Sequence, residues 1–236
     1  MPDVKLFCIP YAGASANIFL RWKRLLPEWI ELIPIELSGR GNRFGEPLYS
    51  SINEAVNDIF SFLQNDIDSR PYAIFGHSLG GLIAYELCHK IKNMGFPSPV
   101  HLFISGKKAP GVKADQAPIS NLPEEQFLNE LIKYKGAHVN VFEHEELMEL
   151  FQPILRSDFR LAELYTHSDQ PKLDIDMSIL YGSNDDYKYY ELSGWKDYTS
   201  KAFKVTILPG DHFFIIHNLK DTINIIQHTL KNYSQN

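Results

Sequence analysis

The chain has 236 residues, of which 44% are hydrophobic and 22% are charged, and its formal net charge at pH 7 is -6. This length and composition fit one α/β domain with room for an insertion. The acidic balance and the lack of a basic run argue against a nucleic-acid surface. No segment approaches about 18 consecutive apolar residues, and the N-terminus lacks a secretion-signal pattern, so we expect a cytoplasmic protein without a membrane anchor.

Cysteine and histidine usage gives no sign of a metal or redox site. The two cysteines, Cys8 and Cys88, fall in a strand pattern and a helix pattern and are best interpreted as small buried hydrophobes. No His-x-x-x-His pair or His/carboxylate cluster has metal-ligand spacing. The glycine-rich segments lack the Gly-x-Gly-x-x-Gly arrangement of dinucleotide sites, so we expect no cofactor and no metal.

The first third of the chain alternates strand and helix patterns. An apolar strand is predicted over residues 5–10, a small-residue loop over 10–16, a helix over 18–26 and a second strand over 29–37. A glycine-rich turn over residues 38–43 follows. Ser51 and Glu54 form a capping box for a helix that we expect to run to about Gln64.

The most informative stretch is residues 72–82, a buried strand that runs directly into a helix predicted over 79–94. Gly76 and Gly80 flank Ser78 in a Gly-x-Ser-x-Gly pattern, at the two positions where a side chain would collide in a sharp strand-to-helix bend. Such a nucleophile elbow lifts the serine hydroxyl clear of the sheet. The helix start places backbone N–H groups beside that hydroxyl.

After a strand over residues 100–105, the rhythm changes. Residues 107–174 show no clear strand but three helical patterns, at 123–134, 143–151 and 154–165, and we expect a helical lid insertion over the strand ends. Strands over 177–181 and 204–208 and a helix over 219–233 complete the chain. The regular alternation predicts an α/β fold, a single domain over 1–236 with a mostly parallel sheet and helices on both faces.

The chemistry expected of Ser78 requires a histidine to take its proton and a carboxylate to orient that histidine. His212 follows the last predicted strand, and Asp185 and Asp186 follow the strand before it. The order Ser, Asp, His is that of the α/β-hydrolase scaffold. Adjacent residues point in different directions, so only one of the two aspartates can face His212.

An oxyanion formed on the substrate needs two aimed donors. One is expected to be the backbone N–H of Leu79, the residue after the nucleophile. The second is expected from the loop after the first strand, where Ala12 is the best choice. Because the donor is a main-chain group, loss of the Ala12 side chain should matter little.

Several motifs together resemble the type II thioesterases that accompany nonribosomal peptide and polyketide synthetases, similar to the external thioesterases of the surfactin and gramicidin systems. They span nearly the whole chain, and they are Pro10-Tyr11-Ala12-Gly13, Ser38-Gly39-Arg40-Gly41, Gly76 to Gly81, Arg156-Ser157-Asp158-Phe159, and Pro209 to Phe214. Departures are Ala14, where the family usually has a second glycine, and Ser38, where it usually has proline. The family's spacing to His212 favours Asp186 over Asp185.

The resemblance implies a serine thioesterase with Ser78, Asp186 and His212 as catalytic residues and Ala12 and Leu79 as oxyanion donors. Its substrates would be acyl or aminoacyl thioesters on the phosphopantetheine arm of a carrier protein, from which it would clear wrongly loaded groups. We expect carrier-protein domains as partners and a monomer. Alternatives are a general carboxylester hydrolase of the same fold and a non-catalytic carrier-protein binder. Passing of the acyl group to an acceptor other than water stays open.

Overall fold

The computed structural model describes residues 3–112, 117–133 and 145–234. Its centre is a six-stranded sheet in the order β2-β1-β3-β4-β5-β6, and every neighbouring pair in it is parallel. The strands are Val4–Ile9 (β1), Ile30–Pro34 (β2), Tyr72–His77 (β3), His101–Ser105 (β4), Asp176–Gly182 (β5) and Phe203–Leu208 (β6). This confirms the predicted α/β fold with a parallel sheet.

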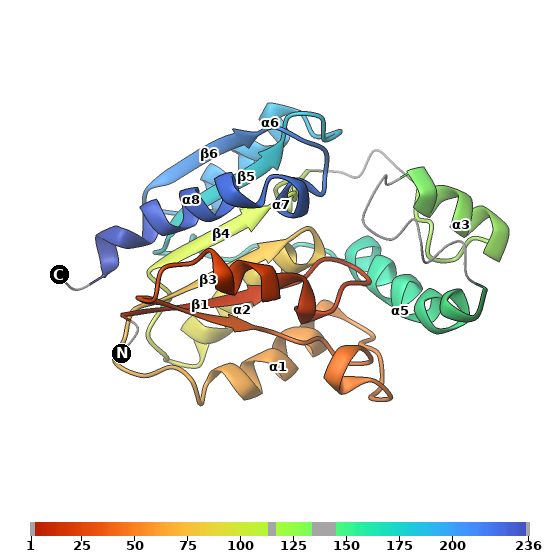
Figure 1. Ribbon diagram of the computed structural model, residues 1–236, viewed down its shortest axis with the longest axis horizontal. Helices are drawn as coiled ribbons and strands as arrows, with labels where there is room; N and C mark the ends of the chain where they lie inside the picture. Colours follow the sequence, from red (N-terminus) through yellow and green to blue (C-terminus); the bar gives the residue numbers. More distant parts are fainter. Residues whose placement is uncertain (1–2, 113–116, 134–144, 235–236) are drawn as a thin grey trace.

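Helices cover both faces of this sheet (Figure 1). The α-helices are Ile52–Leu63 (α1), Leu79–Asn93 (α2), Glu124–Lys133 (α3), Glu145–Leu164 (α5), Tyr189–Ser193 (α6), Phe214–His217 (α7) and Leu219–Leu230 (α8). The 3-10 helices are Ala16–Arg24 (η1), Gly41–Arg43 (η2), Gly194–Tyr198 (η3) and Lys231–Tyr233 (η4). Ser51 caps α1 by accepting a hydrogen bond from the N–H of Glu54, which is one half of the predicted capping box. The side chain of Glu54 accepts from the N–H of Ser50 and not from that of Ser51.

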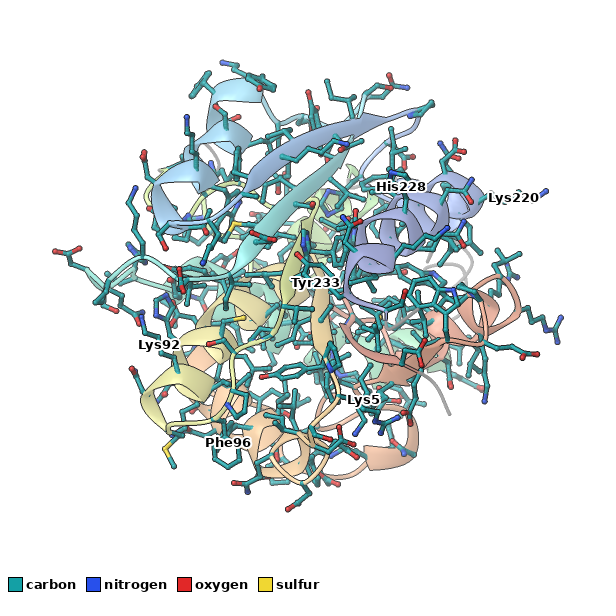
Figure 2. All side chains as sticks on the ribbon, turned by 90° about the vertical axis from the view of Figure 1, so that its left-hand side faces the viewer. Lys5, Lys92, Phe96, Lys220, His228 and Tyr233 are labelled. Carbon is teal, nitrogen blue, oxygen red and sulfur yellow. The ribbon has the colours of Figure 1, made fainter. Side chains whose placement is uncertain are left out.

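The two faces of the sheet bury separate apolar cores. One core joins the sheet to α1 and α2, and the other joins it to η1, α7 and α8. Figure 2 shows Lys92 and Phe96, near the end of α2, on the opposite side of the sheet from Lys220 and His228 of α8. Because both faces are covered, every residue of β1, β3 and β4 is buried.

The region between β4 and β5 holds α3 and α5, which lie beyond the ends of the strands in Figure 1. They share a small core of their own, formed by Ile119, Phe127, Leu131 and Leu155. Two helices were predicted over residues 143–165, but one helix, α5, runs through Pro153. Proline removes one hydrogen bond from a helix, and here the buried residues on both sides of it, Met148, Leu155 and Leu161, hold the helix together.

Other boundaries also differ from the sequence prediction. The residues predicted as an amphipathic helix over 18–26 form the 3-10 helix η1, and β2 ends at Pro34 instead of residue 37. The short elements α6, η3 and α7 were not predicted because four or five residues carry too little periodicity. The predicted helix end at residue 134 and helix start at residue 143 lie outside the described residues.

No helix within the described ranges is both long and apolar enough to cross a bilayer. The two cysteines are buried and unpaired, and burial raises the pKa of each thiol. Their role as small core hydrophobes is therefore confirmed.

Candidate active site

Ser78 stands between the end of β3 and the start of α2, with φ 53° and ψ -115°. It is the one non-glycine residue with positive φ in the described chain, a strained conformation that costs on the order of 1–3 kcal/mol. A Cβ on Gly76 would collide with the main chain of Gly80, and a Cβ on Gly80 would lie 2.6 Å from the carbonyl oxygen of Pro10. The predicted elbow is present, and its glycines are needed for the reasons expected.

The carboxylate beside His212 is Asp185. Its Oδ2 lies 2.9 Å from Nδ1 of His212, and the side chain of Asp185 is 7% exposed. The preference for Asp186 is therefore wrong: Asp186 is exposed, and its main-chain N–H donates to Oδ1 of Asp185 over 2.9 Å. Both oxygens of Asp185 are thus occupied, one by the histidine and one by the turn.

The local turn explains which aspartate faces inward. The N–H of Asp185 donates to the carbonyl of Gly182 over 3.1 Å, and the N–H of Asn184 donates to the carbonyl of Gly210 over 2.8 Å. The first bond closes the turn after β5, and the second ties that turn to the loop after β6 that carries His212. Asp185 is the residue at which this turn points toward the neighbouring loop, and spacing along the sequence cannot reveal that direction.

His212 lies beside the elbow. Its ring centroid is 5.0 Å from that of His77, the residue before Ser78, and its Cε1 would be 3.1 Å from a Cβ on Gly106. With Nδ1 bonded to Asp185, a histidine tautomer that carries its proton on Nδ1 leaves Nε2 as a proton acceptor. The carboxyl ends of β3, β5 and β6 therefore gather a serine, an aspartate and a histidine in one place.

His77 packs inside the elbow. It is fully buried, and its Nδ1 lies 2.8 Å from Oγ of Ser105. Burial and the neighbouring His212 hold the pKa of His77 well below its ordinary value. A neutral His77 places no fixed positive charge next to His212. Ser105 also accepts the N–H of Ser78 at its carbonyl over 2.7 Å.

The two expected oxyanion donors lie in adjoining segments. Gly80, in the first turn of α2, packs against the carbonyls of Ile9 and Pro10 at the start of the loop that contains Ala12. The N–H groups of Ala12 and Leu79 take part in none of the backbone hydrogen bonds that hold this loop and the elbow in the described chain. Both groups are therefore free to bind a ligand oxygen at the start of α2.

The insertion carries mainly structural aromatic residues. Phe127 is fully buried between α3 and α5, and Phe151 and Phe159 pack against the same small core. Arg156 lies over the ring of Phe127 at 4.2 Å and donates to the carbonyls of Ser120 and Leu122. These phenylalanines therefore belong to the insertion's own small core.

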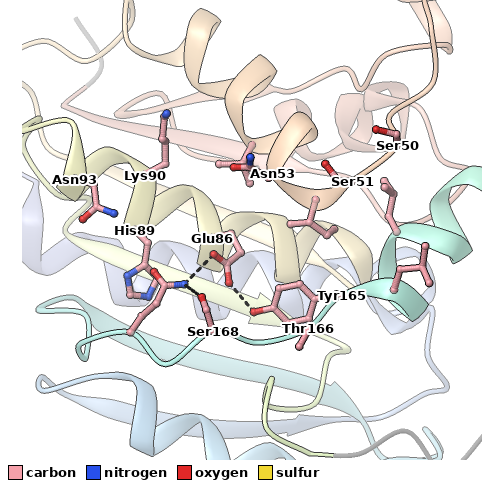
Figure 3. A pocket seen from close by; sticks show the side chains of 15 residues that line it. Ser50, Ser51, Asn53, Glu86, His89, Lys90, Asn93, Tyr165, Thr166 and Ser168 are labelled. Carbon is pink, nitrogen blue, oxygen red and sulfur yellow. Dashed lines mark hydrogen bonds between the residues drawn. The ribbon is translucent and has the colours of Figure 1, made fainter.

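A separate groove of about 720 Å³ lies between α1, α2 and the chain after α5. Figure 3 shows Glu86 at its centre, accepting hydrogen bonds from Tyr165 Oη (2.6 Å) and Gln170 Nε2 (3.1 Å). The groove contains none of the residues Ser78, Asp185 and His212. It is therefore distinct from the candidate active site.

The described residues contain no group of three or more histidine, cysteine, aspartate or glutamate side chains arranged to hold a metal ion. The side chains gathered around Ser78 are instead a hydroxyl, an imidazole and a carboxylate, with main-chain N–H groups beside them. This set is suited to nucleophilic attack on an acyl carbon.

Comparison with known proteins agrees with this chemistry. Residues 4–230 match the family model of the thioesterase domain. The chain is 34% identical to the gramicidin S biosynthesis protein GrsT of Aneurinibacillus migulanus, over 94% of this chain and 87% of that protein. It is also 34% identical to the linear gramicidin dehydrogenase LgrE of Brevibacillus parabrevis, over 98% of this chain and 89% of that protein.

Among solved structures, the chain is similar to ClbQ from the colibactin NRPS/PKS pathway, with a TM-score of 0.94, 33% identity and 98% of each chain covered. The family model spans nearly the whole chain, and the relatives are matched over most of their own length. The chain therefore belongs to the thioesterase family, with an α/β-hydrolase fold.

Proposed function

We propose that this protein is a serine thioesterase that hydrolyses acyl or aminoacyl thioesters on the phosphopantetheine arm of carrier proteins, and so removes misloaded groups from nonribosomal peptide or polyketide synthetases. The observation that carries this proposal is the hydrogen bond between His212 and Asp185 beside the strained elbow of Ser78. The similarity to GrsT and ClbQ supports the synthetase context.

In the proposed acylation step, Oγ of Ser78 attacks the thioester carbonyl while Nε2 of His212 takes the hydroxyl proton. Asp185 holds the resulting imidazolium in place. The N–H groups of Leu79 and Ala12 bind the oxyanion of the tetrahedral intermediate. The C–S bond then breaks, and His212 returns its proton to the departing pantetheine thiolate, which leaves as a thiol.

Deacylation repeats these steps with water. His212 takes a proton from a water molecule, the hydroxide attacks the acyl carbon of the Ser78 ester, and the proton passes to Oγ of Ser78 as the acid departs. Every group used belongs to this chain or to the substrate, so the proposal includes no cofactor.

The proposal extends to the surroundings of the site. Residues 107–174 act as a lid that admits a long, thin pantetheine arm and limits access of bulk water to the acyl-enzyme. The partners are acyl or peptidyl carrier protein domains, and we expect the enzyme to work as a monomer in the cytoplasm.

The test is the intact mass of an acetyl- or aminoacyl-loaded carrier protein followed over time. The purified protein should remove the acyl mass, and Ser78→Ala should leave the carrier loaded. A nitrophenyl ester serves as the rival substrate. Faster cleavage of the ester than of the loaded carrier would favour a general carboxylester hydrolase, and no turnover of either would favour a carrier-protein binder.

A further inference from the structure

Two sequence motifs have no part in the proposed chemistry, and the structure brings them together. Arg40 comes from the glycine-rich turn after β2, and Asp158 comes from the second half of α5, 118 residues further along the chain. Both terminal guanidinium nitrogens of Arg40 donate to the carboxylate of Asp158, one of them over 2.8 Å to Oδ1. Arg40 is 3% exposed and Asp158 1%, so the pair is buried.

The buried carboxylate also binds the loop that contains the expected oxyanion donor. Oδ2 of Asp158 accepts the N–H of Gly13 over 2.7 Å. The same oxygen accepts from Arg40, so the guanidinium fixes the carboxylate in the orientation that receives Gly13. Leu155, one turn earlier on α5, packs so closely on Gly13 that a Cβ there would collide with its side chain.

The geometry of this loop explains why the contact matters for Ala12. The N–H of Ala14 donates to the carbonyl of Tyr11 over 3.0 Å, which closes a turn with Gly13 as its third residue. The φ of +78° at Gly13 fits a type II turn. The carbonyl of Tyr11 and the N–H of Ala12 belong to one planar trans peptide and point in opposite directions. A carbonyl held inside the turn therefore directs the N–H of Ala12 out of it.

The central peptide of this turn carries the N–H of Gly13, whose bond to Asp158 and close packing on Leu155 attach the turn to α5. Without that attachment the whole turn is free to shift, and the N–H of Ala12 shifts with it. We propose that Asp158, oriented by Arg40, is a positioning residue that fixes the turn and so aims the N–H of Ala12 at the oxyanion. This inference rests on the proposed function, because it assigns Asp158 a part in the same reaction.

The position of Asp158 also links the insertion to catalysis. Two residues before it, Arg156 binds carbonyls of the chain that leads to α3, and Glu163 accepts the N–H of Ile119 over 2.7 Å. α5 is thus attached to the rest of the insertion by Arg156 and Glu163, and to the loop of residues 10–16 by Asp158. A shift of α5 would be transmitted to the donor at Ala12.

The test uses two matched double variants. R40M/D158L replaces the buried pair with apolar side chains, an exchange that proteins often tolerate, but leaves Gly13 without its acceptor. R40Q/D158N also removes both charges, but it places an amide at each position. The amide at position 158 keeps an oxygen that can accept the N–H of Gly13 and an N–H that can donate to the amide at position 40. Comparing the two variants separates loss of charge from loss of the acceptor.

We expect R40M/D158L to lower kcat on a loaded carrier protein by about 10- to 100-fold with little change in KM, since a misaimed oxyanion donor affects the transition state. R40Q/D158N should recover most of that loss. Affinity for a trifluoromethyl ketone analogue of the thioester, which forms an oxyanion on the serine, should fall in parallel with kcat/KM. Asp58→Asn is the control. It breaks the ion pair between Asp58, on α1, and Arg43, and it should leave kcat unchanged.

A folded R40M/D158L variant, identified by its circular dichroism and melting temperature, with the kcat and analogue affinity of the unaltered protein would overturn the proposal. Equal losses in both double variants would do so too, because the acceptor would then be irrelevant. Hydrogen exchange at the amide of Gly13 gives a readout independent of turnover, and it should be fast in R40M/D158L and slow in R40Q/D158N. An unaltered protein that leaves the carrier loaded would instead refute the proposed function.

Discussion

Two loops meet beside Ser78, and they are held in different ways. The loop after β6, which carries His212, is bound by its neighbour in the sheet: Asn184 donates to Gly210, and Asp185 binds the histidine itself. The loop after β1, residues 10–16, is bound by residues distant in sequence, including Asp158 on α5. We therefore expect the proposed base, His212, to depend on the neighbouring loop after β5, and the proposed main-chain donor, Ala12, to depend on the helical insertion.

The two loops are held differently because one positions an imidazole side chain and the other positions a main-chain N–H group. An imidazole has a second nitrogen through which one carboxylate sets its orientation and tautomer. A main-chain N–H is aimed by fixing the peptide plane around it, which takes contacts on both sides of the turn. Asp158 holds one side of the 10–16 loop, and Glu36 holds the other, accepting from Ser15 Oγ over 2.8 Å and from the N–H of Ala16 over 2.9 Å.

Breaking the hydrogen bond between His212 and Asp185 should have the strongest effect on kcat. Asp185→Asn removes the carboxylate that stabilises the proton on Nδ1 of His212, and kcat on a loaded carrier should fall by about 10³- to 10⁴-fold. Asp186→Asn is the matched control and should stay within about twofold of the unaltered protein, because Asp186 touches only the turn. Equal losses in both variants would mean that the loop, and not the carboxylate, is what matters.

Distorting the loop of residues 10–16, which contains Ala12, should have the second-largest effect on kcat. Gly13→Ala strains a residue with φ +78° and drives a methyl group into Leu155, so kcat should fall by about 10- to 100-fold. Gly95→Ala places the same substitution at φ +75° with no atom within 4 Å of the new Cβ. Both variants should lose stability through backbone strain, but only Gly13→Ala should lose kcat. A matching loss in Gly95→Ala would assign the effect to global stability.

Releasing the other side of the donor loop should have a milder effect. Glu36→Ala removes the acceptors of Ser15 and Ala16 but leaves the bond from Gly13 to Asp158, so we expect kcat to fall by about 3- to 10-fold. Glu31→Ala, which breaks a surface ion pair with Arg70, is the control. Steady-state kinetics on the loaded carrier checks both variants. If kcat fell as much in Glu36→Ala as in R40M/D158L, the contacts of Glu36 and of Asp158 would matter equally for the loop of residues 10–16.

A histidine outside both loops should affect stability and not turnover. Burial lowers the pKa of His101 to about 4, while nearby Asp176 opposes the shift. Between pH 6.5 and 4 the unfolded chain binds more protons than the folded one, so stability is complete above about pH 6.5 and falls by about 3 kcal/mol as the pH drops to 4.

Denaturant unfolding of the unaltered protein and of His101→Gln across this range tests the prediction. The acid loss should be smaller in His101→Gln, and His228→Gln, on the exposed side of α8, should retain it in full. If His101→Gln lost as much unfolding free energy between pH 6.5 and 4 as the unaltered protein, His101 would not be the source of the acid loss.

The sequence predicted the sheet, the elbow and the positions of Ser78 and His212, because each depends on short-range patterns. Buried strands are apolar runs, and the bend at Ser78 requires glycine at fixed positions on either side. Both Asp185 and Asp186 were named, but Asp186 was preferred, because turn hydrogen bonds decide which of two adjacent side chains points toward the neighbouring loop. That direction has no signature in sequence spacing.

The contact between Arg40 and Asp158 could not be predicted from local sequence patterns, for a different reason. Both residues stood in motifs that the resemblance pointed to, but a pairing across 118 residues follows only from how α5 packs against the glycine-rich turn. The continuity of α5 through Pro153 was missed likewise, since tertiary packing overrode the local preference of proline.

The most direct measurement is a rapid-quench reaction of the protein with an acyl-loaded carrier protein, followed by peptide mapping of the enzyme by mass spectrometry. If Ser78 is the nucleophile, the acyl group is found on the peptide that contains Ser78 at early times and disappears as free acid accumulates. Release of acid with no acyl group on that peptide, or with the acyl group on another residue, would contradict the proposed serine mechanism.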